Sequence, residues 1–263
     1  MLIVGEKINT SLKGIEEAVA NKDAKFFQEL AKKQVEHNAD IIDVNVGTRI
    51  HTEVEDMRWM VRVVQEVVDV PLSIDSPNFK AIEAGLEEHK GKAMVNSITA
   101  EKERMEQVLP LVQKFHSKIV ALAMDDDGIP EDVEKRYKIT QHLIEVLTSS
   151  GIPPEDIYID PMIRPISTDS KCGKVALEAI RKIKTSFKEV HIICGLSNIS
   201  FGLPKRGLLN RTFLLMAMAM GLDSAILDPL DKRVMAALRA GEAIVGKDDY
   251  CARYLTSFRK GEF

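Results

Sequence analysis

The segment IICGLSNISFGLPKRGLLNR, residues 192–211, contains the change of pattern that decides the fold. It begins with an apolar pair and becomes small and polar at GLSN, residues 195–198. A loop marked by Gly and Pro follows, and then an apolar run that Asn210 or Thr212 opens. This pattern predicts a buried strand, a polar loop and a helix. In chains that repeat such a unit, ligands are held at the carboxyl ends of the strands, so Asn198 is the first residue we expect to act on a ligand.

The same unit recurs along the whole chain. The eight predicted strands lie within LIVGEKIN (2–9), ADIIDVNVG (39–47), PLSIDSP (71–77), KAMVNSIT (92–99), KIVALAMDDDG (118–128), DIYIDPMIRP (156–165), HIICGLSN (191–198) and SAILDP (224–229). These runs are continuously apolar and do not alternate with polar residues. Both faces of each strand should therefore be buried, as they are in a parallel sheet.

Helical patterns separate these strands. The predicted helices cover residues 25–37, 54–68, 78–89, 101–115, 131–149, 174–186, 211–220 and 232–245. Eight strand–helix units of about thirty residues each predict an α/β protein that forms one (β/α)8 TIM barrel over residues 1–263. A doubly wound open sheet is the alternative, but it usually has fewer strands and a Gly-rich first turn, which GEKINTSLKG (5–14) lacks. No linker rich in Pro, Ser or Gly divides the chain, so we expect a single domain.

The overall composition excludes several classes of protein. Lys and Arg number 36 against 40 Asp and Glu, a net charge of −4, so nothing favours binding to nucleic acid or to an anionic membrane. The N-terminal MLIVGEKIN (1–9) has no signal-peptide core, and no apolar run is long enough to span a bilayer. Cys172, Cys194 and Cys251 lie far apart without metal-site spacing, which indicates reduced thiols in a cytoplasmic protein.

In a closed barrel the carboxyl ends of all strands meet on one face, and this sequence places acids and amides there. The candidates at strand ends are Glu6, Asn9, Asp43, Asn45, Asp75, Asn96, Met124, Asp160, Ser197, Asn198 and Asp228. No His, Cys or Lys takes an obvious nucleophile position. Carboxylates accept two parallel hydrogen bonds, and amides both donate and accept. The set therefore suits a flat heterocycle rich in N–H donors, such as a reduced pterin.

These acids also have a purely structural interpretation. A single strand-end acid such as Asp43 more often caps the following helix or accepts loop amides. Asp75, Asn96 and Asp160 all stand at strand ends, and three such coincidences favour a binding site over three independent caps.

Other conspicuous residues favour plainer interpretations. Met124 is expected to pack in the wall and Cys194 to be buried and unreactive. The triplet 125–127, DDD, lacks the later ligands of a calcium loop and predicts an exposed acidic turn, so we expect no metal site. Lys205 and Arg206 are either a solvated pair or, because they follow the seventh strand, part of an anion-binding loop.

Seven segments in order, GEKIN, DVNVG, SIDS…AIEAGL, MVNS, YIDP, GLSNISFGLPKR…NR and GLDSAI, resemble the pterin-binding methyltransferase family. The closest likeness is to methyltetrahydrofolate:corrinoid protein methyltransferases and to the folate domain of cobalamin-dependent methionine synthase. Together the segments span almost the whole chain. Dihydropteroate synthase shares the barrel, but its Ser-Arg/Lys phosphate-binding signature is not visible around SAILDP. The resemblance therefore implies a pterin-binding barrel of the methyltransferase type.

Carried over residue by residue, the resemblance implies roles for the strand-end residues. Asp75, Asn96 and Asp160 would hold the pterin ring, and Asn198 would lie near N5 as the catalytic residue. The other implied folate contacts are Glu6, Asn9, Gly195, Ser197 and Arg206. Candidates for a layer behind these contacts are Asp43, Asn45, Met124 and Asp228. Phe201 departs from acetogen-type members, which carry a polar residue there, whereas the methionine-synthase side resembles GLSNISFG as written.

The implied reaction moves the N5-methyl group between methyltetrahydrofolate and the cobalt of a corrinoid. Cob(I)alamin is itself a strong nucleophile, so the protein would position the two reactants in line and stabilise N5. No Asp stands two residues before any His, as the cobalamin-binding signature Asp-x-His-x-x-Gly requires. The corrinoid should therefore arrive on a separate protein, and the resemblance also implies a homodimer.

Two other functions stay open from the residues alone: a pterin enzyme like dihydropteroate synthase, and a folate-binding protein without catalytic activity. Within the leading interpretation, the corrinoid protein could serve an acetyl-CoA, an O-demethylation, or a methylamine or betaine route. Either direction of methyl transfer is compatible with the same residues.

Overall fold

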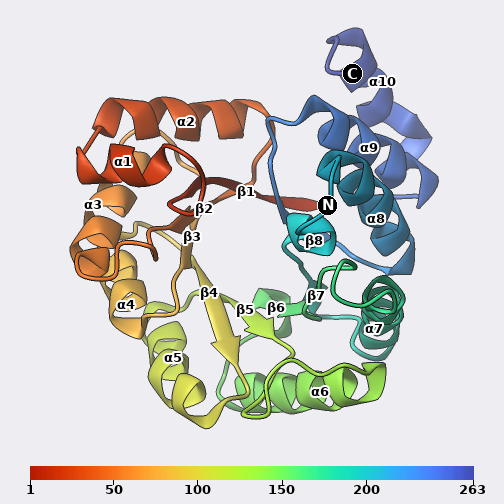
Figure 1. Ribbon diagram of the computed structural model, residues 1–263, viewed down its shortest axis with the longest axis horizontal. Coiled ribbons are helices and arrows are strands. Elements are labelled where there is room, and N and C mark those ends of the chain that lie inside the picture. The colour runs from red at the N-terminus through yellow and green to blue at the C-terminus, as the bar shows by residue number, and fades with distance from the viewer.

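The computed structural model describes residues 1–263 and contains eight parallel strands that follow one another around a barrel (Figure 1). The strands are β1 (Leu2–Asn9), β2 (Ile41–Asn45), β3 (Leu72–Asp75), β4 (Met94–Thr99), β5 (Lys118–Leu122), β6 (Ile157–Asp160), β7 (His191–Ile192) and β8 (Ser224–Leu227). They pair in the order β7-β6-β5-β4-β3-β2-β1-β8. A parallel bridge between Gly195 and Ile226 joins the two ends, and the Ile226 N–H donates to the Cys194 carbonyl at 2.9 Å. The predicted (β/α)8 architecture is confirmed.

Helices surround the strands on the outside (Figure 1). They are α1 (Ile15–Ala20), α2 (Ala24–Glu36), α3 (Glu53–Gln65), α4 (Phe79–Glu88), α5 (Lys102–Phe115), α6 (Val133–Ser149), α7 (Cys172–Ser186), α8 (Arg206–Met220), α9 (Lys232–Ile244) and α10 (Ala252–Arg259). Three short 3-10 helices are η1 (Pro154–Asp156), η2 (Leu196–Ser200) and η3 (Asp249–Cys251). Side chains cap four of the α-helices at their N-termini: Asp23, Asn78, Asp132 and Asp231. None of these four is a predicted site residue.

The alternation of side chains along the strands divides the core in two. One strand face packs under the helices in a cluster of 55 buried apolar residues. The other face fills the interior of the barrel with a separate cluster formed by Val4, Ile41, Met94, Val120, Tyr158 and Ile193. This inner cluster closes the lower part of the barrel, so that only the inward residues nearer the carboxyl ends of the strands can meet a ligand.

Helix α8 begins earlier than the sequence pattern predicted. The prediction placed its start at Asn210 or Thr212, whereas the structure places it at Arg206. The preceding residue, Lys205, has a left-handed backbone conformation with φ of 52°, which turns the chain out of the loop. Arg206 then donates from Nη2 to the Ser197 carbonyl at 2.7 Å and attaches the first turn of α8 to η2. This turn contains Gly207 and the exposed Leu208, and the sequence pattern assigned it to the preceding loop marked by Gly and Pro.

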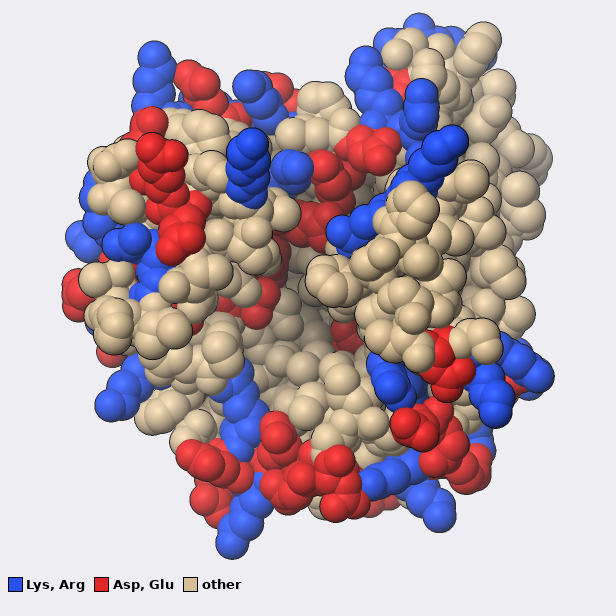
Figure 2. Space-filling view, in the orientation of Figure 1, with Lys and Arg blue, Asp and Glu red and all other residues tan.

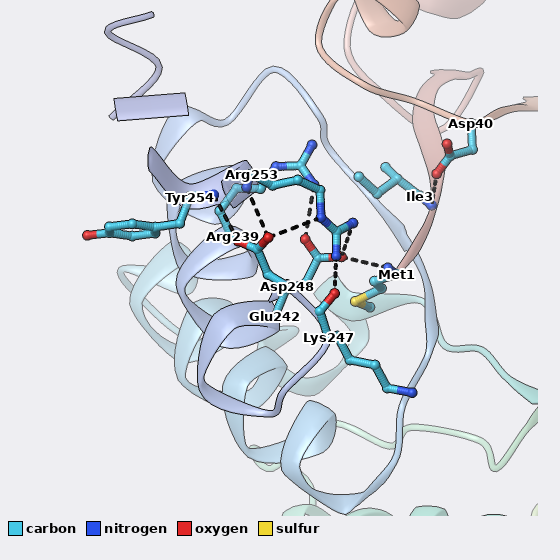
Figure 3. Close-up of polar contacts among 9 residues, drawn as sticks. All are labelled: Met1, Ile3, Asp40, Arg239, Glu242, Lys247, Asp248, Arg253 and Tyr254. Atoms are coloured by element: carbon cyan, nitrogen blue, oxygen red, sulfur yellow. Dashed lines mark hydrogen bonds and ion pairs between the residues drawn. The ribbon is translucent and has the colours of Figure 1, made fainter. Parts of the chain in front are cut away.

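The sequence pattern also missed α10. The buried Glu242 connects this helix to the N-terminus of the chain (Figure 3). Glu242 in α9 accepts hydrogen bonds from the Met1 ammonium at 2.6 Å, from Arg239 at 3.0 Å and from Arg253 at 3.2 Å. Asp248 accepts the backbone N–H of Arg253 at 2.9 Å. Helix α10 is therefore held through polar contacts that a search for apolar periodicity does not detect.

The cysteines are all unpaired: Cys172 and Cys194 are buried, and Cys251 is exposed. None of the helices has both the length and the apolar character that crossing a bilayer requires.

Candidate functional site

The inward side chains become polar at the carboxyl ends of the strands. On six of the eight strands the last inward position, or the residue just beyond the strand, is an acid or an amide: Glu6, Asn45, Asp75, Asn96, Asp160 and Asp228. Figure 2 shows acidic side chains lining the hollow at the centre of the barrel. One row of paired residues runs from Asn45 to Asp75 and on to Asn96 across β2, β3 and β4. The convergence predicted from the sequence is therefore present on this side of the barrel.

Hydrogen bonds connect the acids and amides of β2, β3 and β4. The Asn45 amide donates from Nδ2 to Asp75 Oδ2 at 2.8 Å. Behind them, Asp43 is 2% exposed and accepts the Ser73 hydroxyl at 2.7 Å and the Asn96 amide at 3.4 Å. Asp43 caps no helix, and its contacts are with the side chains of Ser73 and Asn96. Asp75 and Asn96 present their remaining polar atoms to the hollow.

Asp43 is buried and Asp75 is half-buried, and neither carboxyl group forms an ion pair. Burial and the neighbouring Asp75 raise the pKa of Asp43 well above its usual range. Burial also raises the pKa of Asp75 to about 6, although hydrogen bonds from Asn45 and Asp43 and the charge of Arg104 oppose the increase. At neutral pH, Asp75 is therefore mostly ionised and able to accept hydrogen bonds.

Asp160, on the opposite side of the hollow, is a second buried acid without a cation in contact. Its Oδ1 accepts the Met162 N–H at 2.7 Å. Burial raises the pKa of Asp160 to about 6. Hydrogen bonds from the Met162 and Gly195 N–H groups and the charge of Arg136 lower this pKa, but their effect is smaller than that of burial. Burial and the charge of Asp160 both raise the pKa of the Cys194 thiol. This thiol is fully buried and is therefore unsuited to nucleophilic chemistry.

The β1 and β8 side of the mouth carries mixed charges. Lys7 Nζ lies 3.0 Å from Asp228 Oδ2, and Asp228 Oδ1 also accepts the Leu230 N–H at 2.9 Å. Burial and the nearby Asp228 raise the pKa of Glu6 to about 7, although the charges of Lys7 and Arg206 act in the opposite direction. Glu6 is therefore a carboxyl group that changes its protonation state near neutral pH.

The GLSN segment forms the start of η2, above the end of β7. Asn198 is exposed, and its side chain makes no hydrogen bond within the chain. A Cβ atom on Gly195 would lie 3.0 Å from Asn198 Nδ2, so Gly195 lets the amide fold back over the strand end. Arg206 donates to the Ser197 carbonyl and, from Nε, to Ser200 Oγ at 3.1 Å. The loop is thus held by α8 while the Asn198 amide stays free.

Asn9 and Met124 lie less directly at the mouth. The side-chain oxygen of Asn9, Oδ1, accepts the backbone N–H of Ser11 at 2.9 Å and the Ser11 hydroxyl at 2.7 Å. The oxygen of this side-chain amide is therefore used in a turn. Met124 is half-buried just after β5, in agreement with wall packing. The acidic triplet forms an exposed turn as predicted, in which Lys135 Nζ lies 2.7 Å from Asp127 Oδ2.

Two functional candidates escaped the sequence interpretation, Arg104 and Arg136. Both lie near the mouth and contribute charge to the acids described above. Each stands in the first turn of a helix, where the helix dipole favours anions and disfavours cations. An arginine at such a position is a signal that the side chain has a tertiary partner.

Sequence comparison relates this chain to known proteins. Residues 8–228 match the family described as pterin binding enzyme. The chain is 38% identical over 267 aligned positions to the methylcorrinoid:tetrahydrofolate methyltransferase of Eubacterium limosum, with 100% of this chain and 97% of that protein covered. It is also 31% identical over 239 positions to the methionine synthase of Mycobacterium tuberculosis, which covers 86% of this chain and 20% of the longer relative.

Solved structures with a similar fold are dihydropteroate synthases. The enzyme from Yersinia pestis bound to a sulfonamide drug has a TM-score of 0.71 and 16% identity, over 92% of this chain and 93% of that one. The enzyme from Xanthomonas albilineans in complex with 7,8-dihydropteroate has a TM-score of 0.71 and 19% identity, with 92% of each chain covered. Identities this low establish a shared fold and no more.

Proposed function

The chain belongs to the pterin-binding enzyme family, and on that premise we propose that it is a methyltransferase acting between tetrahydrofolate and a corrinoid carried by another protein. The relative from Eubacterium limosum, whose name describes transfer from a methylcorrinoid to tetrahydrofolate, matches this chain over almost its whole length. We propose the same direction here. The observation that carries the proposal is the ring of buried and half-buried acids and amides at one end of the barrel, with few cations paired to it.

Asp75, Asn96 and Asp160 bind the pterin ring in this proposal. The edge of a reduced pterin presents several N–H donors, and an ionised carboxylate accepts two parallel donors. The pKa values of Asp75 and Asp160, both about 6, leave these groups mostly ionised at pH 7. Neither carboxylate contacts a cation that a ligand would have to displace. The Asn96 amide, oriented by Asp43, supplies both a donor and an acceptor.

Asn198 acts at N5. Its amide is free of hydrogen bonds within the chain, stands at the mouth and can hydrogen-bond to N5 without adding a charge.

The corrinoid supplies the cobalt that carries or receives the methyl group. In the proposed direction N5 gains the methyl carbon and must lose its own proton. Glu6, with a pKa of about 7, and the acids with a pKa of about 6 are suited to accept that proton at neutral pH.

The corrinoid protein docks on the mouth of the barrel. Large apolar side chains are exposed on the loops that surround it: Leu12 (37%), Ile50 (77%), Ile129 (40%), Phe201 (64%) and Leu208 (59%). They come from the segments after β1, β2, β5 and β7, on the face where the methyl group must leave. Exposed apolar groups of this kind are common at protein interfaces. The departure noted at Phe201 therefore supports a contact with the partner protein and not with folate.

A second copy of the chain occupies another surface in this proposal. A groove of about 540 Å³ lies between α7 and α8 on the outside of the barrel, with Leu177, Ile199 and Phe213 among its lining residues. Met216, at its edge, is 48% exposed. The groove is apolar and separate from the mouth, so a homodimer formed here leaves both active sites open to the corrinoid protein.

We place the reaction in the cytoplasm, the compartment that keeps free thiols such as Cys251 reduced.

The test of the proposed function is a spectroscopic assay. The purified chain is mixed with methylcobalamin and tetrahydrofolate, and with cob(I)alamin and methyltetrahydrofolate, and the cobalamin absorbance is followed. We expect turnover in at least one direction. A protein that binds methyltetrahydrofolate but shows no turnover in either mixture would be a folate-binding protein. Formation of dihydropteroate from a dihydropterin pyrophosphate and p-aminobenzoate would instead support a synthase.

A further inference from the structure

Arg104 and Arg136 make the same kind of contact on the two sides of the mouth. Each lies in the first turn of its helix, α5 or α6; Arg104 is half-buried and Arg136 is buried. Each donates only to backbone carbonyl groups and forms no ion pair within 4.0 Å. A guanidinium group has five donors in a fixed plane, so it can hold several carbonyls in one geometry.

Arg104 joins the segments that follow Asp75 and Asn96. Its Nη2 donates to the Ser76 carbonyl at 2.8 Å and to the Ser97 carbonyl at 2.7 Å. Its Nε donates to the same Ser97 carbonyl at 2.9 Å, and Nη1 donates to the Pro77 carbonyl at 2.6 Å. Ser76 and Ser97 are the residues immediately after the two pterin candidates. Arg104 therefore fixes the backbone from which both of these side chains project.

Arg136 makes the equivalent connection on the β6 side. It is 1% exposed, and its Nη1 donates to the carbonyls of Pro161 at 2.9 Å and Met162 at 2.8 Å. Its Nε donates to the Pro130 carbonyl, in the segment after β5, at 3.0 Å. Pro161 immediately follows Asp160, and the Met162 N–H donates to the Asp160 carboxylate. Arg136 therefore holds the turn that closes around this acid.

We propose that Arg104 and Arg136 are positioning residues for the pterin site, which hold the turns behind Asp75, Asn96 and Asp160 and place positive charge behind the two carboxylates. Neither guanidinium needs to touch the ligand. The proposal rests on the proposed function, because it assigns the ligand to these three side chains.

Both parts of the role follow from the surroundings of each acid. The charged or titratable groups that face Asp75 are Asp43, Glu53 and Arg104, and only Arg104 is positive. The groups that face Asp160 are Cys194 and Arg136, and only Arg136 is positive. Arg136 itself is also near Cys172, Arg164 and Asp132. Loss of either arginine therefore leaves an acid with no opposing cation. The pKa of that acid should rise, so that its carboxylate accepts hydrogen bonds from the ligand only at higher pH.

The test compares Gln and Lys substitutions at each position in the full-length protein. Arg104→Gln removes both the charge and the planar donors, whereas Arg104→Lys keeps the charge and loses the planar arrangement. Arg58→Gln is the matched control, because Arg58 pairs with Glu87 and Glu88 on the outer face of the barrel. Binding of methyltetrahydrofolate is measured by calorimetry between pH 5 and 8. Carboxyl ¹³C titration reports the pKa values of Asp75 and Asp160 without ligand.

We expect Arg104→Gln to weaken folate binding about tenfold at pH 7 and to move the loss of binding at acidic pH to higher pH. Arg104→Lys should weaken binding by a similar factor but keep the wild-type pH profile. Arg136→Gln and Arg136→Lys should behave in the same way for Asp160, and the Arg58 control should change neither property.

The outcomes separate the two proposals. If the wild-type protein does not bind methyltetrahydrofolate, the proposed function fails. If it binds, but folded Arg104 variants bind as tightly as the control at every pH, the positioning role is wrong. Arg136→Gln leaves three carbonyls without a donor and could unfold the protein. The half-buried Arg104 and the Lys variants keep the proposal testable in that case.

Discussion

The two ends of the barrel contain buried or half-buried aspartates in opposite electrostatic surroundings. At the floor, Asp223 Oδ2 lies 2.8 Å from Lys184 Nζ and 3.4 Å from His191 Nδ1, and these partners hold its pKa below the usual range. At the mouth, Asp75 and Asp160 contact amides and backbone N–H groups, and burial raises the pKa of each to about 6. Asp223 is thus paired with cations at the floor, whereas Asp75 and Asp160 have no cation in contact at the mouth.

This difference agrees with the proposed function, in which the mouth binds the ligand and the floor contributes to the stability of the fold. Lys118 strengthens the pattern at the floor: its Nζ lies 3.1 Å from the Tyr158 hydroxyl and 3.7 Å from Asp156 Oδ1. Paired charges at the floor stabilise the folded chain. Unpaired buried carboxylates cost stability, and proteins retain such groups where a ligand completes their hydrogen bonds. Substitutions at the two ends should therefore affect different properties.

The largest effect is expected at the mouth, from Asn198→Ala. Loss of a hydrogen bond that strengthens as N5 changes its bonding should lower kcat by about 10²–10³-fold. The folate dissociation constant should change little, because Asn198 is exposed and is not one of the carboxylates that bind the pterin ring in the proposal. Stopped-flow absorbance of the cobalamin measures the rate, and calorimetry measures binding. Wild-type kcat in this variant would remove Asn198 from the mechanism.

A somewhat smaller effect is expected from Asp75→Asn, also at the mouth. Replacing a carboxylate that accepts two donors by an amide should weaken folate binding by about 30-fold, or roughly 2 kcal/mol. The unfolding free energy at pH 7 should not decrease, since a buried charge is removed and the Asn45 donor still finds an oxygen. Calorimetric binding and urea unfolding test the two statements. A destabilised variant with intact binding would reverse the assignment of the two ends.

The corresponding substitution at the floor, Asp223→Asn, should do the opposite. It removes the charge that pairs with Lys184 and His191, and the unfolding free energy should fall by about 1–2 kcal/mol. Folate binding should stay at the wild-type value, because the inner apolar cluster separates the floor from the mouth. Urea unfolding and calorimetry on the same preparation provide the comparison with Asp75→Asn.

A final comparison is a pH dependence of stability whose sign differs between the two ends. The folded-state pKa values of Asp75, Asp160 and Glu6 are raised, so the folded chain binds more protons than the unfolded chain between about pH 4 and 7. Stability without ligand should therefore increase from pH 7 to pH 5. The folded-state pKa of Asp223 is lowered, so its contribution is lost only below about pH 4.

Thermal unfolding from pH 3 to 8 measures this dependence. Each kcal/mol should change Tm by roughly 2–4 °C in a chain of this size. Folate binding should weaken over the same interval, from pH 7 to 5, in which the protein without ligand becomes more stable. An unfolding temperature that rises steadily to pH 8 would contradict the charge assignment at the mouth.

The sequence predicted the parts of this molecule that depend on local patterns. Continuous apolar runs ending in DVN, SID and YID predicted both the parallel strands and the acids at their ends, because a strand's carboxyl end can be read from the chain itself. The start of α8 was wrong because its first turn, with Gly207 and the exposed Leu208, was assigned to the preceding loop. Arg206 holds that turn on the Ser197 carbonyl, a contact that the sequence pattern does not show. Helix α10 was missed because polar contacts to Glu242 and Asp248 attach it.

By itself, the sequence determined the barrel, the face that carries the polar residues and the identity of those residues, since periodicity and residue type are local properties. Only the tertiary structure decided which acids are paired with cations and which are not. Pairing depends on distances between segments far apart in the chain, as Lys184 is from Asp223 and Arg136 is from Pro161. Together with burial, those distances set the pKa values, and they distinguish the floor, with its paired acids, from the mouth that we propose as the binding site.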